Sequence, residues 1–234
     1  MTGQGYKPRD WSSQPPLIHP AYKSTGLRGP TKSLIPIPTS LSEITGPIYG
    51  HDAIDPIDAD LTRNAVRNGE PIGERIVVEG RVLDEDGRAV PGTLIEIWQA
   101  NAAGRYIHRA EIHDAPLDPN FFGAGRTVTN DHGHYRFVTL KPGAYPWGNH
   151  HNAWRPAHIH FSLFGPSIAT RLVTQMYFEG DPTFPFDPIF NATPEVARDL
   201  LIAKFSLDRT EPEWAQAYVF DIVLRGRDAT PMEG

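Results

Sequence analysis

The chain has 234 residues, 39% of them hydrophobic, and a formal net charge of −6 at pH 7. This balance, with no block rich in Lys or Arg, argues against nucleic acid as a partner and favours small molecules. The absence of cysteine excludes disulfides, zinc knuckles, cysteine-ligated iron–sulfur clusters and thiol catalysis. No apolar run is long enough to span a bilayer, and the first residues lack the profile of a signal peptide. We therefore expect a cytoplasmic protein without membrane contact.

Residues 1–74 have the composition of an extended arm that contacts another subunit. They hold many of the 23 prolines, each of which fixes φ and removes a backbone donor, as in segments that lie on another surface. Scattered apolar side chains such as Leu17 favour packing on a partner chain over a solvated tail. A short helix is predicted after Ser40, because Ser40 and Glu43 have capping-box spacing and Gly46-Pro47 would end it.

From residue 75 the pattern changes to short runs of apolar and β-branched residues between turns. Gly and Pro number 21 and 23 of 234 residues, above the usual share of about 12%, which predicts many turns and few long helices. The predicted strands cover residues 75–83, 93–99, 134–138, 157–164, 171–178 and 217–224. This spacing predicts a catalytic domain over residues 75–234 that is an antiparallel β-sandwich.

One helix is predicted in the C-terminal region. Thr193 is a capping residue and Pro194 suits the first helical position, so the helix would run to about Phe205. The predicted fold class is thus all-β: an antiparallel β-sandwich with an extended, proline-rich N-terminal arm and one short helix.

His158 and His160 form the first candidate site. Residues two apart in a strand point to the same face and lie roughly 6.6 Å apart along the chain. The apolar residues of the predicted strand would occupy one face and the two imidazoles the other. Such a pair makes half of a metal site, and an exposed strand face that happens to carry two histidines is an equally good interpretation. Two further pairs lie in turn-like or loop-like sequence and are interpreted as solvated: His132 with His134, and His150 with His151.

Tyr106 and Tyr145 are the second kind of candidate. Tyr106 follows a predicted strand, and Tyr145 lies in a loop that neighbouring prolines stiffen. Taken alone, either residue is more simply a packing residue with its hydroxyl in water. A phenolate is nevertheless a hard anionic donor, and a trivalent iron would lower its pKa from the free value near 10. Two histidines and two tyrosinates around Fe(III) form a coherent set, unlike the two-histidine, one-carboxylate set of ferrous oxygenases.

Several short strings, in one order, resemble the pattern of the intradiol ring-cleaving dioxygenases. The strings are Ile97-Trp-Gln-Ala-Asn101, Gly104-Arg-Tyr106, Asp118-Pro-Asn-Phe121, Pro142-Gly-Ala-Tyr-Pro-Trp147, Trp154-Arg-Pro-Ala-His-Ile-His-Phe161 and Gln175-Met-Tyr-Phe-Glu-Gly-Asp-Pro182. The resemblance covers residues 75–226, and the string from Trp154 to Phe161 is the specific one. It implies cleavage of a small aromatic substrate, protocatechuate, by O₂ at a non-haem Fe(III) centre, giving 3-carboxy-cis,cis-muconate.

The resemblance also implies a ligand set. Tyr145 and His160 would be axial ligands of the iron, and Tyr106 and His158 would be equatorial beside a bound hydroxide. The phenolate of Tyr145 would leave the metal when the substrate binds and would accept one of its protons.

Further residues match family positions around the substrate. Arg155 matches an active-site arginine that stabilises negative charge on the ring, and Gln175 matches the residue that holds this arginine. Trp147 and Ile189 match pocket walls, and Tyr22, in the arm, matches a residue that meets the substrate carboxylate. Without the resemblance, Arg155 would pass as a surface arginine and the two pocket walls as packing residues.

The resemblance implies a homologous alpha chain as partner in a hetero-oligomer, with the active site near their contact. One alternative from another class is a non-catalytic, transthyretin-like β-sandwich that serves as a binding or scaffold subunit, which residues 78–91 would also suit. Matches at all four ligand positions argue against it. A cupin-type metalloenzyme is a second alternative, but residues 162–167 do not supply the glutamate that a cupin needs after the histidine pair.

Overall fold

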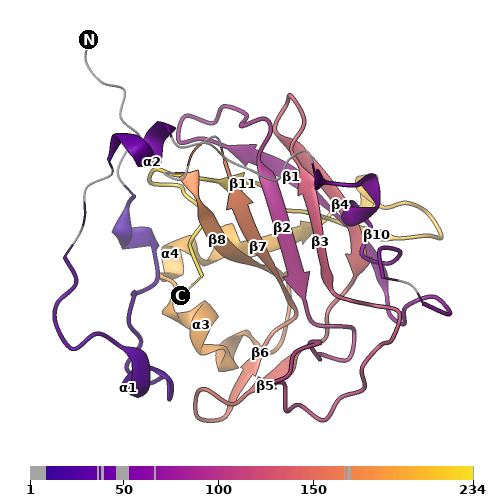
Figure 1. Cartoon of the computed structure of the whole chain (residues 1–234), viewed down its shortest axis with the longest axis horizontal. Coiled ribbons are helices and arrows are strands. Elements are labelled where there is room, and N and C mark those ends of the chain that lie inside the picture. Colours follow the sequence, from indigo (N-terminus) through magenta and orange to yellow (C-terminus); the bar gives the residue numbers. More distant parts are fainter. Residues whose placement is uncertain are drawn as a thin grey trace.

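The computed structural model describes residues 9–35, 37, 40–45, 53–65, 67–165, 167 and 170–233. The strands there are β1 (Arg75–Leu83), β2 (Leu94–Gln99), β3 (Ala124–Val128), β4 (His134–Leu140), β5 (Tyr145–Trp147), β6 (Ala153–Arg155), β7 (His158–Phe164), β8 (Leu172–Phe178), β9 (Ile202–Phe205), β10 (Gln216–Val219) and β11 (Ile222–Val223). The α-helices are α1 (Thr25–Arg28), α2 (Leu41–Thr45), α3 (Pro188–Ala192) and α4 (Glu195–Arg198), and 3-10 turns are η1 (Trp11–Ser13), η3 (Pro56–Ala59), η5 (Phe184–Phe186), η6 (Asp199–Leu201) and η7 (Leu207–Arg209). Strands dominate and helices are few and short, as the sequence predicts (Figure 1).

The main sheet is mixed, so the prediction of a purely antiparallel sheet is wrong. Its strands follow the order β11-β1-β10-β9-β8-β7-β2-β3, with β4 beside β1. β1 pairs in parallel with β10 and β11, and β8 pairs in parallel with β9. The two strands of each parallel pair are joined by the long crossovers that parallel pairing requires. Because the alternation of apolar and polar residues is the same in either direction, the sequence pattern could not reveal strand direction.

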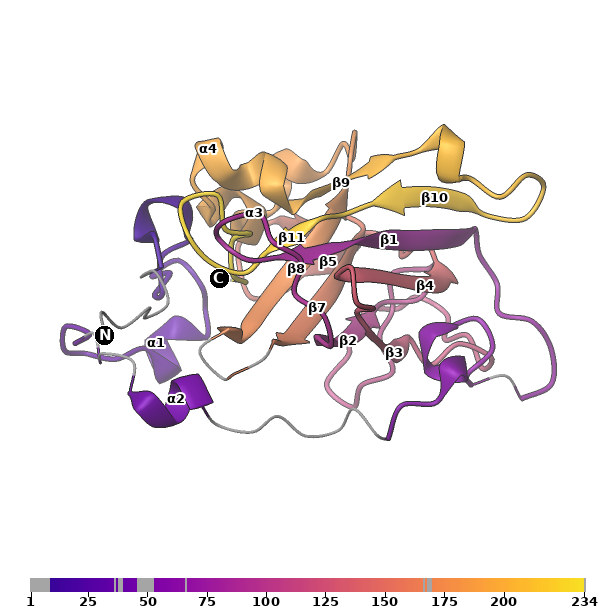
Figure 2. The same cartoon turned by 90° about the horizontal axis from the view of Figure 1, so that it is seen from above.

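Aromatic side chains from different parts of the sheet meet in one core. The rings of Phe137 on β4 and Phe161 on β7 lie 5.8 Å apart, although β4 and β7 are not hydrogen-bonded neighbours. Phe220 packs on Phe161 as well, at 5.4 Å. In Figure 2, β1 and β10 run across the direction of β7 and β8, which lets the two sets of strands pack face to face. The core therefore covers one face of β7 and leaves the histidines on its other face.

The predicted strand over residues 217–224 is divided into β10 and β11. β10 pairs with the first half of β1 and β11 with the second half. Between them, the carbonyl of Phe220 accepts a hydrogen bond from the Tyr135 hydroxyl at 2.6 Å. This carbonyl crosses Gly80 so closely that a Cβ there would lie 1.9 Å from the oxygen. A buried tyrosine and a close backbone approach thus interrupt the strand.

The predicted helix from Thr193 to Phe205 is wrong in extent. Thr193 ends α3, Pro194 precedes α4, and the chain then passes through η6 into β9. β9 fills the place between β8 and β10, where Ala203 is completely buried beside Phe178. Closing the sheet satisfies the backbone hydrogen bonds of this segment and buries its apolar side chains, which outweighs the local preference for helix.

The described part of the arm packs on the domain of its own chain. Lys23 N donates to Asn149 O, and Ser24 N donates to Asn149 Oδ1, both at 2.8 Å. The predicted short helix is present as α2, and the Glu43 carboxylate accepts from Ser40 N as the capping box requires. Its predicted end at Gly46-Pro47 lies outside the described residues. The division into arm and catalytic domain, and the contact of the arm with another subunit, stay predictions.

None of the described helices combines the length and the apolar character that crossing a bilayer would require.

Candidate metal centre

β7 presents His158 and His160 side by side in a closed interior. The strand lies between β2 and β8, and its apolar residues pack in the core as predicted. The histidine side of the strand is not exposed, because His158 is 1% and His160 is 8% accessible. Their ring centroids lie 4.9 Å apart. The interpretation of a solvated strand face is therefore wrong.

Two tyrosines approach the histidines from other segments. Tyr145 begins β5, which pairs with β6 in a short hairpin, and Tyr106 lies in the loop that follows β2. Gly104 makes their approach feasible: its φ is +79°, and a Cβ at this position would lie 2.4 Å from the carbonyl oxygen of Ala144. Only glycine adopts this conformation freely and leaves that space empty. The sequence thus brings the Tyr106 loop against the residue that precedes Tyr145.

Four potential metal donors converge. The hydroxyl of Tyr145 lies 3.3 Å from His158 Nε2, and that of Tyr106 lies 3.5 Å from the same nitrogen. The Tyr106 hydroxyl also lies 3.2 Å from His160 Nε2. Neighbouring ligands of a metal with bonds of about 2.0–2.1 Å lie roughly 3 Å apart. The structure therefore brings together all four residues that the sequence predicts as ligands, at separations suited to one ion.

Contacts outside this group orient the two imidazoles. His158 Nδ1 lies 2.7 Å from the Pro156 carbonyl, an acceptor that places the ring proton on Nδ1. His160 Nδ1 lies 3.1 Å from a carboxylate oxygen of Glu233, and the His160 ring stacks on Trp98 at 4.7 Å. Both Nε2 lone pairs are thereby directed toward the tyrosine hydroxyls. No motif or spacing in the sequence singles out Glu233, which is 73 residues from its partner.

Burial controls the protonation of both tyrosines and of His158. It raises the pKa of Tyr145, and it raises the pKa of Tyr106 well above the usual value, with the neighbouring Tyr145 adding to the effect. Burial and then the charge of Arg155 hold the pKa of His158 well below its usual value. Without a cation, therefore, the two phenols keep their protons and this imidazole is neutral. A neutral imidazole and a phenol that only a strong cation would ionise fit a trivalent metal.

The donor set also limits which metal fits. Within the ranges that the structure describes, no three His, Asp or Glu side chains are grouped as a metal site. The candidate set has two nitrogens and two phenol oxygens, and hard anionic oxygen favours a hard ion of high charge. The residues present thus fit a ferric ion, with Tyr106, Tyr145, His158 and His160 to hold it.

Arg155 lies beside the four donors, almost completely buried at 3% accessibility. It pairs with Tyr145 across the β5–β6 hairpin. Its Nη2 donates to Gln175 Oε1 and, at 3.2 Å, to the Tyr177 hydroxyl. Its Nε lies 3.1 Å from Asp187 Oδ1. Burial alone would lower the pKa of Arg155, but Tyr177 and Asp187 raise it above the usual value, so the guanidinium stays charged.

Two of these partners were absent from the predicted site. Tyr177 is two residues beyond Gln175 in β8, so strand alternation alone could have placed it on the same face. Asp187 precedes a proline and caps α3 by accepting from Ile189 N at 2.9 Å. The cap was recognisable in the sequence, but the contact with Arg155, 32 residues away, was not.

The predicted pocket residues fall into two groups. Arg155 Cζ lies 5.8 Å from the ring centroid of Trp147, and Tyr22 meets the same indole edge-on at 5.0 Å. The arm therefore reaches the site. Burial raises the pKa of Tyr22 to about 12, with the Asp187 charge adding to the shift, so its hydroxyl stays protonated. Ile189 is buried on α3 and is linked to the site through Asp187.

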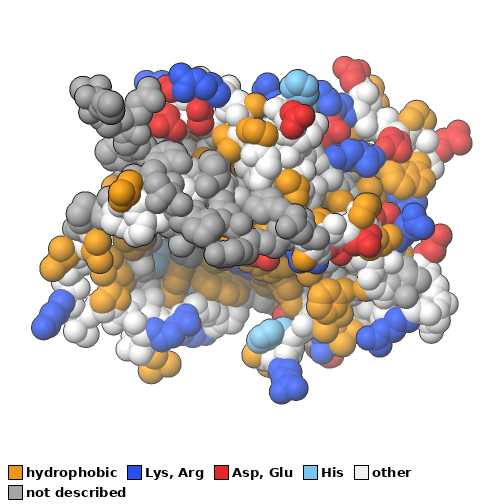
Figure 3. Space-filling view, turned by 45° about the horizontal axis from the view of Figure 1, so that its top comes forward, with side chains coloured by type: hydrophobic (Ala, Val, Ile, Leu, Met, Phe, Trp, Pro, Cys, Tyr) orange, Lys and Arg blue, Asp and Glu red, His pale blue; other side chains and the backbone are white. Residues whose placement is uncertain are grey.

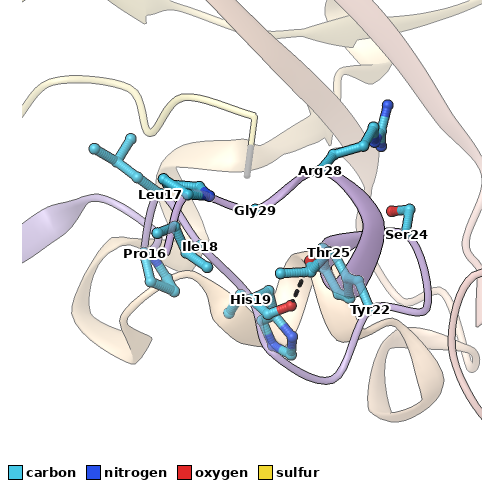
Figure 4. A pocket seen from close by; sticks show the side chains of 11 residues that line it. Pro16, Leu17, Ile18, His19, Tyr22, Ser24, Thr25, Arg28 and Gly29 are labelled. Carbon is cyan, nitrogen blue, oxygen red and sulfur yellow. Dashed lines mark hydrogen bonds between the residues drawn. The ribbon is translucent and has the colours of Figure 1, made fainter. Parts of the chain in front are cut away.

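Two cavities adjoin this region. One of 460 Å³ is lined by Tyr106, Tyr145 and His160 together with Trp98 and Phe122. A smaller one of 220 Å³ lies in the arm, where Tyr22 and His19 stack and the Thr25 hydroxyl donates to the His19 carbonyl at 2.8 Å (Figure 4). The larger cavity gives a small molecule room beside three of the four donors.

On the face drawn in Figure 3, acidic and basic side chains of the described residues are interspersed rather than gathered by sign.

The chain matches two models of known protein families and several characterised relatives. Residues 44–226 match a family model described as Dioxygenase, and residues 8–40 match one described as Protocatechuate 3,4-dioxygenase beta subunit N terminal. The protocatechuate 3,4-dioxygenase beta chain of Burkholderia cepacia is 65% identical over 226 residues, which is 97% of this chain and 96% of that one. The protocatechuate 3,4-dioxygenase alpha chain of Pseudomonas putida is 30% identical over 203 residues, 83% of this chain and 95% of that one.

A solved structure shows the same fold. The crystal structure of 3-chlorocatechol 1,2-dioxygenase from Rhodococcus opacus 1CP superposes with a TM-score of 0.55 at 24% identity, over 80% of this chain and 72% of that one. Because the family model spans most of the chain and the beta-chain relative matches nearly all of it, the chain belongs to the intradiol ring-cleavage dioxygenase family, among the protocatechuate 3,4-dioxygenase beta chains.

Proposed function

We propose that this chain cleaves protocatechuate with O₂ at a non-haem Fe(III) centre, giving 3-carboxy-cis,cis-muconate. The observation that carries the proposal is the convergence of two tyrosine hydroxyls and two histidine Nε2 atoms, which three contacts of 3.2–3.5 Å link into one group. The 65% identity to a protein named protocatechuate 3,4-dioxygenase beta chain supports the choice of substrate.

The residues would hold the ion through Tyr106, Tyr145, His158 and His160. A bound ferric ion would supply Lewis acidity and a template on which the two ring oxygens of the catechol are held. The imidazoles are already oriented through Nδ1, so binding requires little rearrangement of either ring. The phenols change most, because each must lose a proton that burial otherwise retains.

Tyr145 would move one of the protons of the reaction. A catechol gives up two protons when both of its oxygens bind a metal, and these need acceptors inside the site. The Tyr145 oxygen, in its phenolate form, would take one of them, and burial favours the neutral phenol that results. The two atoms of O₂ are both retained in the ring-opened product, so no reductant is needed.

Arg155 would stabilise negative charge that develops on the ring during oxygen attack. Its guanidinium is charged, buried and held by Gln175 and Tyr177. Fixed charge in a site that excludes water commonly contributes about 3–4 kcal/mol to a transition state. Trp147 and Ile189 would form walls against the aromatic ring, and the Tyr22 hydroxyl, which stays protonated, would donate to the substrate carboxylate.

A homologous alpha chain would be the partner in a hetero-oligomer. Proteins named protocatechuate 3,4-dioxygenase alpha chain are related to this chain, which supports an assembly of two homologous subunits. Apolar side chains of the arm that no described residue covers, such as Leu27 at 89% accessibility, suit such a contact.

The visible absorption spectrum and the iron content of the purified protein test the function. Ferric tyrosinate should give a broad red-brown charge-transfer band, and the band should shift when protocatechuate is added without oxygen. Admitting oxygen should then restore the original band as product forms. A protein that stays colourless after reconstitution with iron and the alpha chain would contradict the proposed metal centre. The alternative of a non-catalytic β-sandwich subunit would then be favoured.

A further inference from the structure

Asp187 is the one carboxylate in direct contact with Arg155 among the described residues, and it is completely buried at 0% accessibility. Its Oδ1 lies 3.1 Å from Arg155 Nε and also accepts from Ile189 N at 2.9 Å. Its Oδ2 and the Arg155 Nε are both buried, and neither makes a hydrogen bond to any residue that the structure describes, so the contact between the two side chains is ionic. A buried charge of this kind is stable only beside an opposite charge. The carboxylate and the guanidinium therefore neutralise each other.

A second copy of the same short sequence shows that capping alone does not explain this burial. Asp55-Pro56-Ile57 repeats Asp187-Pro188-Ile189, and Asp55 Oδ1 accepts from Ile57 N at 3.0 Å in the same capping geometry. Asp55, however, lies on the exposed surface. A capping aspartate in this motif does not need to be buried, so the burial of Asp187 calls for another cause, and its only ionic contact with the described residues is Arg155.

The surroundings make Asp187 the anchor on one edge of the guanidinium. Gln175 and Tyr177, both on β8, accept from Nη2, whereas Asp187, before α3, meets Nε. The backbone of Asp187 is itself fixed, because its nitrogen donates to Phe184 O and its carbonyl accepts from Asn191 N. Hydrogen bonds at Nη2 and an ion pair at Nε, from two different elements, restrain rotation of the planar group in its own plane.

We propose that Asp187 is a positioning residue that sets the orientation of the Arg155 guanidinium and ties it to the pocket wall at Ile189. The inference rests on the proposed function, since Arg155 acts on the substrate there. One carboxylate oxygen contacts both the arginine and the first turn of α3. A shift of the pocket wall is thereby transmitted to the charge that faces the reaction, and Asp187 itself touches no reacting atom.

The test compares Asp187→Asn with Asp55→Asn in the iron-loaded complex with the alpha chain. Asparagine keeps an oxygen to cap the helix and removes the charge, so any difference between the variants reports the contact with Arg155. In Asp187→Asn we expect iron content and the visible band to be retained and kcat to fall at least tenfold, with a smaller change in KM. In Asp55→Asn we expect kcat to match the unchanged protein. Equal kcat in the two variants would overturn the inference.

A double-mutant cycle separates positioning from general destabilisation. If Asp187 acts through Arg155, adding Asp187→Asn to Arg155→Met should not lower kcat further. If the double variant instead shows the product of the two separate losses in kcat, the inference is wrong.

The folding of the variants provides a second test. Should Asp187→Asn alone fail to fold, folding of the double variant would support the inference, because both charges are then removed together. Failure of the double variant while Arg155→Met folds would assign Asp187 to capping alone. If the protein without substitutions shows neither the visible band of ferric tyrosinate nor activity, the proposed function is wrong.

Discussion

Residues that are not themselves candidate metal ligands determine the orientation and the donor strength of those ligands. Glu233 illustrates this, because its carboxylate meets His160 Nδ1 and its backbone nitrogen donates to Val173 O at 2.8 Å. Burial would raise the pKa of Glu233, but the contact with His160 lowers it below the usual value, so it carries a charge beside the imidazole. A carboxylate in this position makes the histidine a stronger donor to a metal.

Replacing Glu233 with Gln should weaken iron retention and leave the fold intact. Gln preserves an acceptor for Nδ1 but removes the charge, and loss of such an outer partner commonly costs about 10–100-fold in metal affinity. The rate of iron loss to a chelator, followed by the visible band, measures the effect. Glu195→Gln on the exposed surface of α4 is the matched control. Equal rates in both variants would contradict a role for the Glu233 charge.

The sequence identifies the candidate metal ligands but not every residue that orients the site. His158 and His160 stand out through alternation within one strand, and the family pattern supplies Tyr106 and Tyr145. Asp187 was not found, because the Asp-Pro-Ile motif also occurs at Asp55, where it only caps a turn. Distinguishing the two copies requires knowing which one lies against a buried arginine, and that contact is made only in three dimensions.

At the scale of elements, turns and close approaches decide which segments meet. Most predicted strands are present, because alternation over five or more residues reflects one buried face. β3 (Ala124–Val128) was not predicted, since Gly125, its second residue, weakens a strand pattern. The structure shows why glycine is there: a Cβ at this position would lie 2.5 Å from the Asp58 carbonyl oxygen. The crossing segment that needs this space is invisible to a local pattern.

Gly104→Ala should separate the Tyr106 loop from Tyr145. The added Cβ would lie 2.4 Å from the Ala144 carbonyl oxygen, and the residue has a positive φ of +79°. The positive φ alone costs about 1–2 kcal/mol for a residue other than glycine, and the clash adds to it. Gly87→Ala is the control, because Gly87 has a φ of +76° with nothing within 4 Å.

We expect the Gly104 variant to lose most of its ferric-tyrosinate absorbance while the Gly87 variant keeps it. Thermal melting should show a similar strain in both variants and an additional loss only in the first. If the absorbance at equal iron concentration is the same in both variants, the close approach at Gly104 is not what places Tyr106.

For the whole molecule, the candidate centre joins segments that are far apart in sequence. Tyr106 comes from the loop after β2, Tyr145 from β5, and the two histidines from β7. The arm contributes Tyr22 from the opposite end of the chain and is held to the loop after β5 by Lys23 and Asn149. The sequence predicted the sheet-rich domain, but strand direction and the path of the arm depend on which distant surfaces fit together.

Because one ion would bridge three of these segments, removing it should lower the thermal stability of the whole domain. A ligand that binds only the folded state at a thousandfold excess over Kd stabilises by about 4 kcal/mol. For a domain of this size, that corresponds to a shift in Tm on the order of 10 °C. The measurement compares melting of the iron-loaded and the chelated protein, with iron restored to the chelated sample.

The variant in which both Tyr106 and Tyr145 are changed to Phe is the control. Phenylalanine preserves the packing of both rings. The Tm of this variant should therefore approach that of the chelated protein and should not change when iron is added. If chelation leaves the Tm of the unchanged protein where it was, iron does not bridge the segments, and the buried hydrogen bonds among the four side chains are sufficient to hold them together.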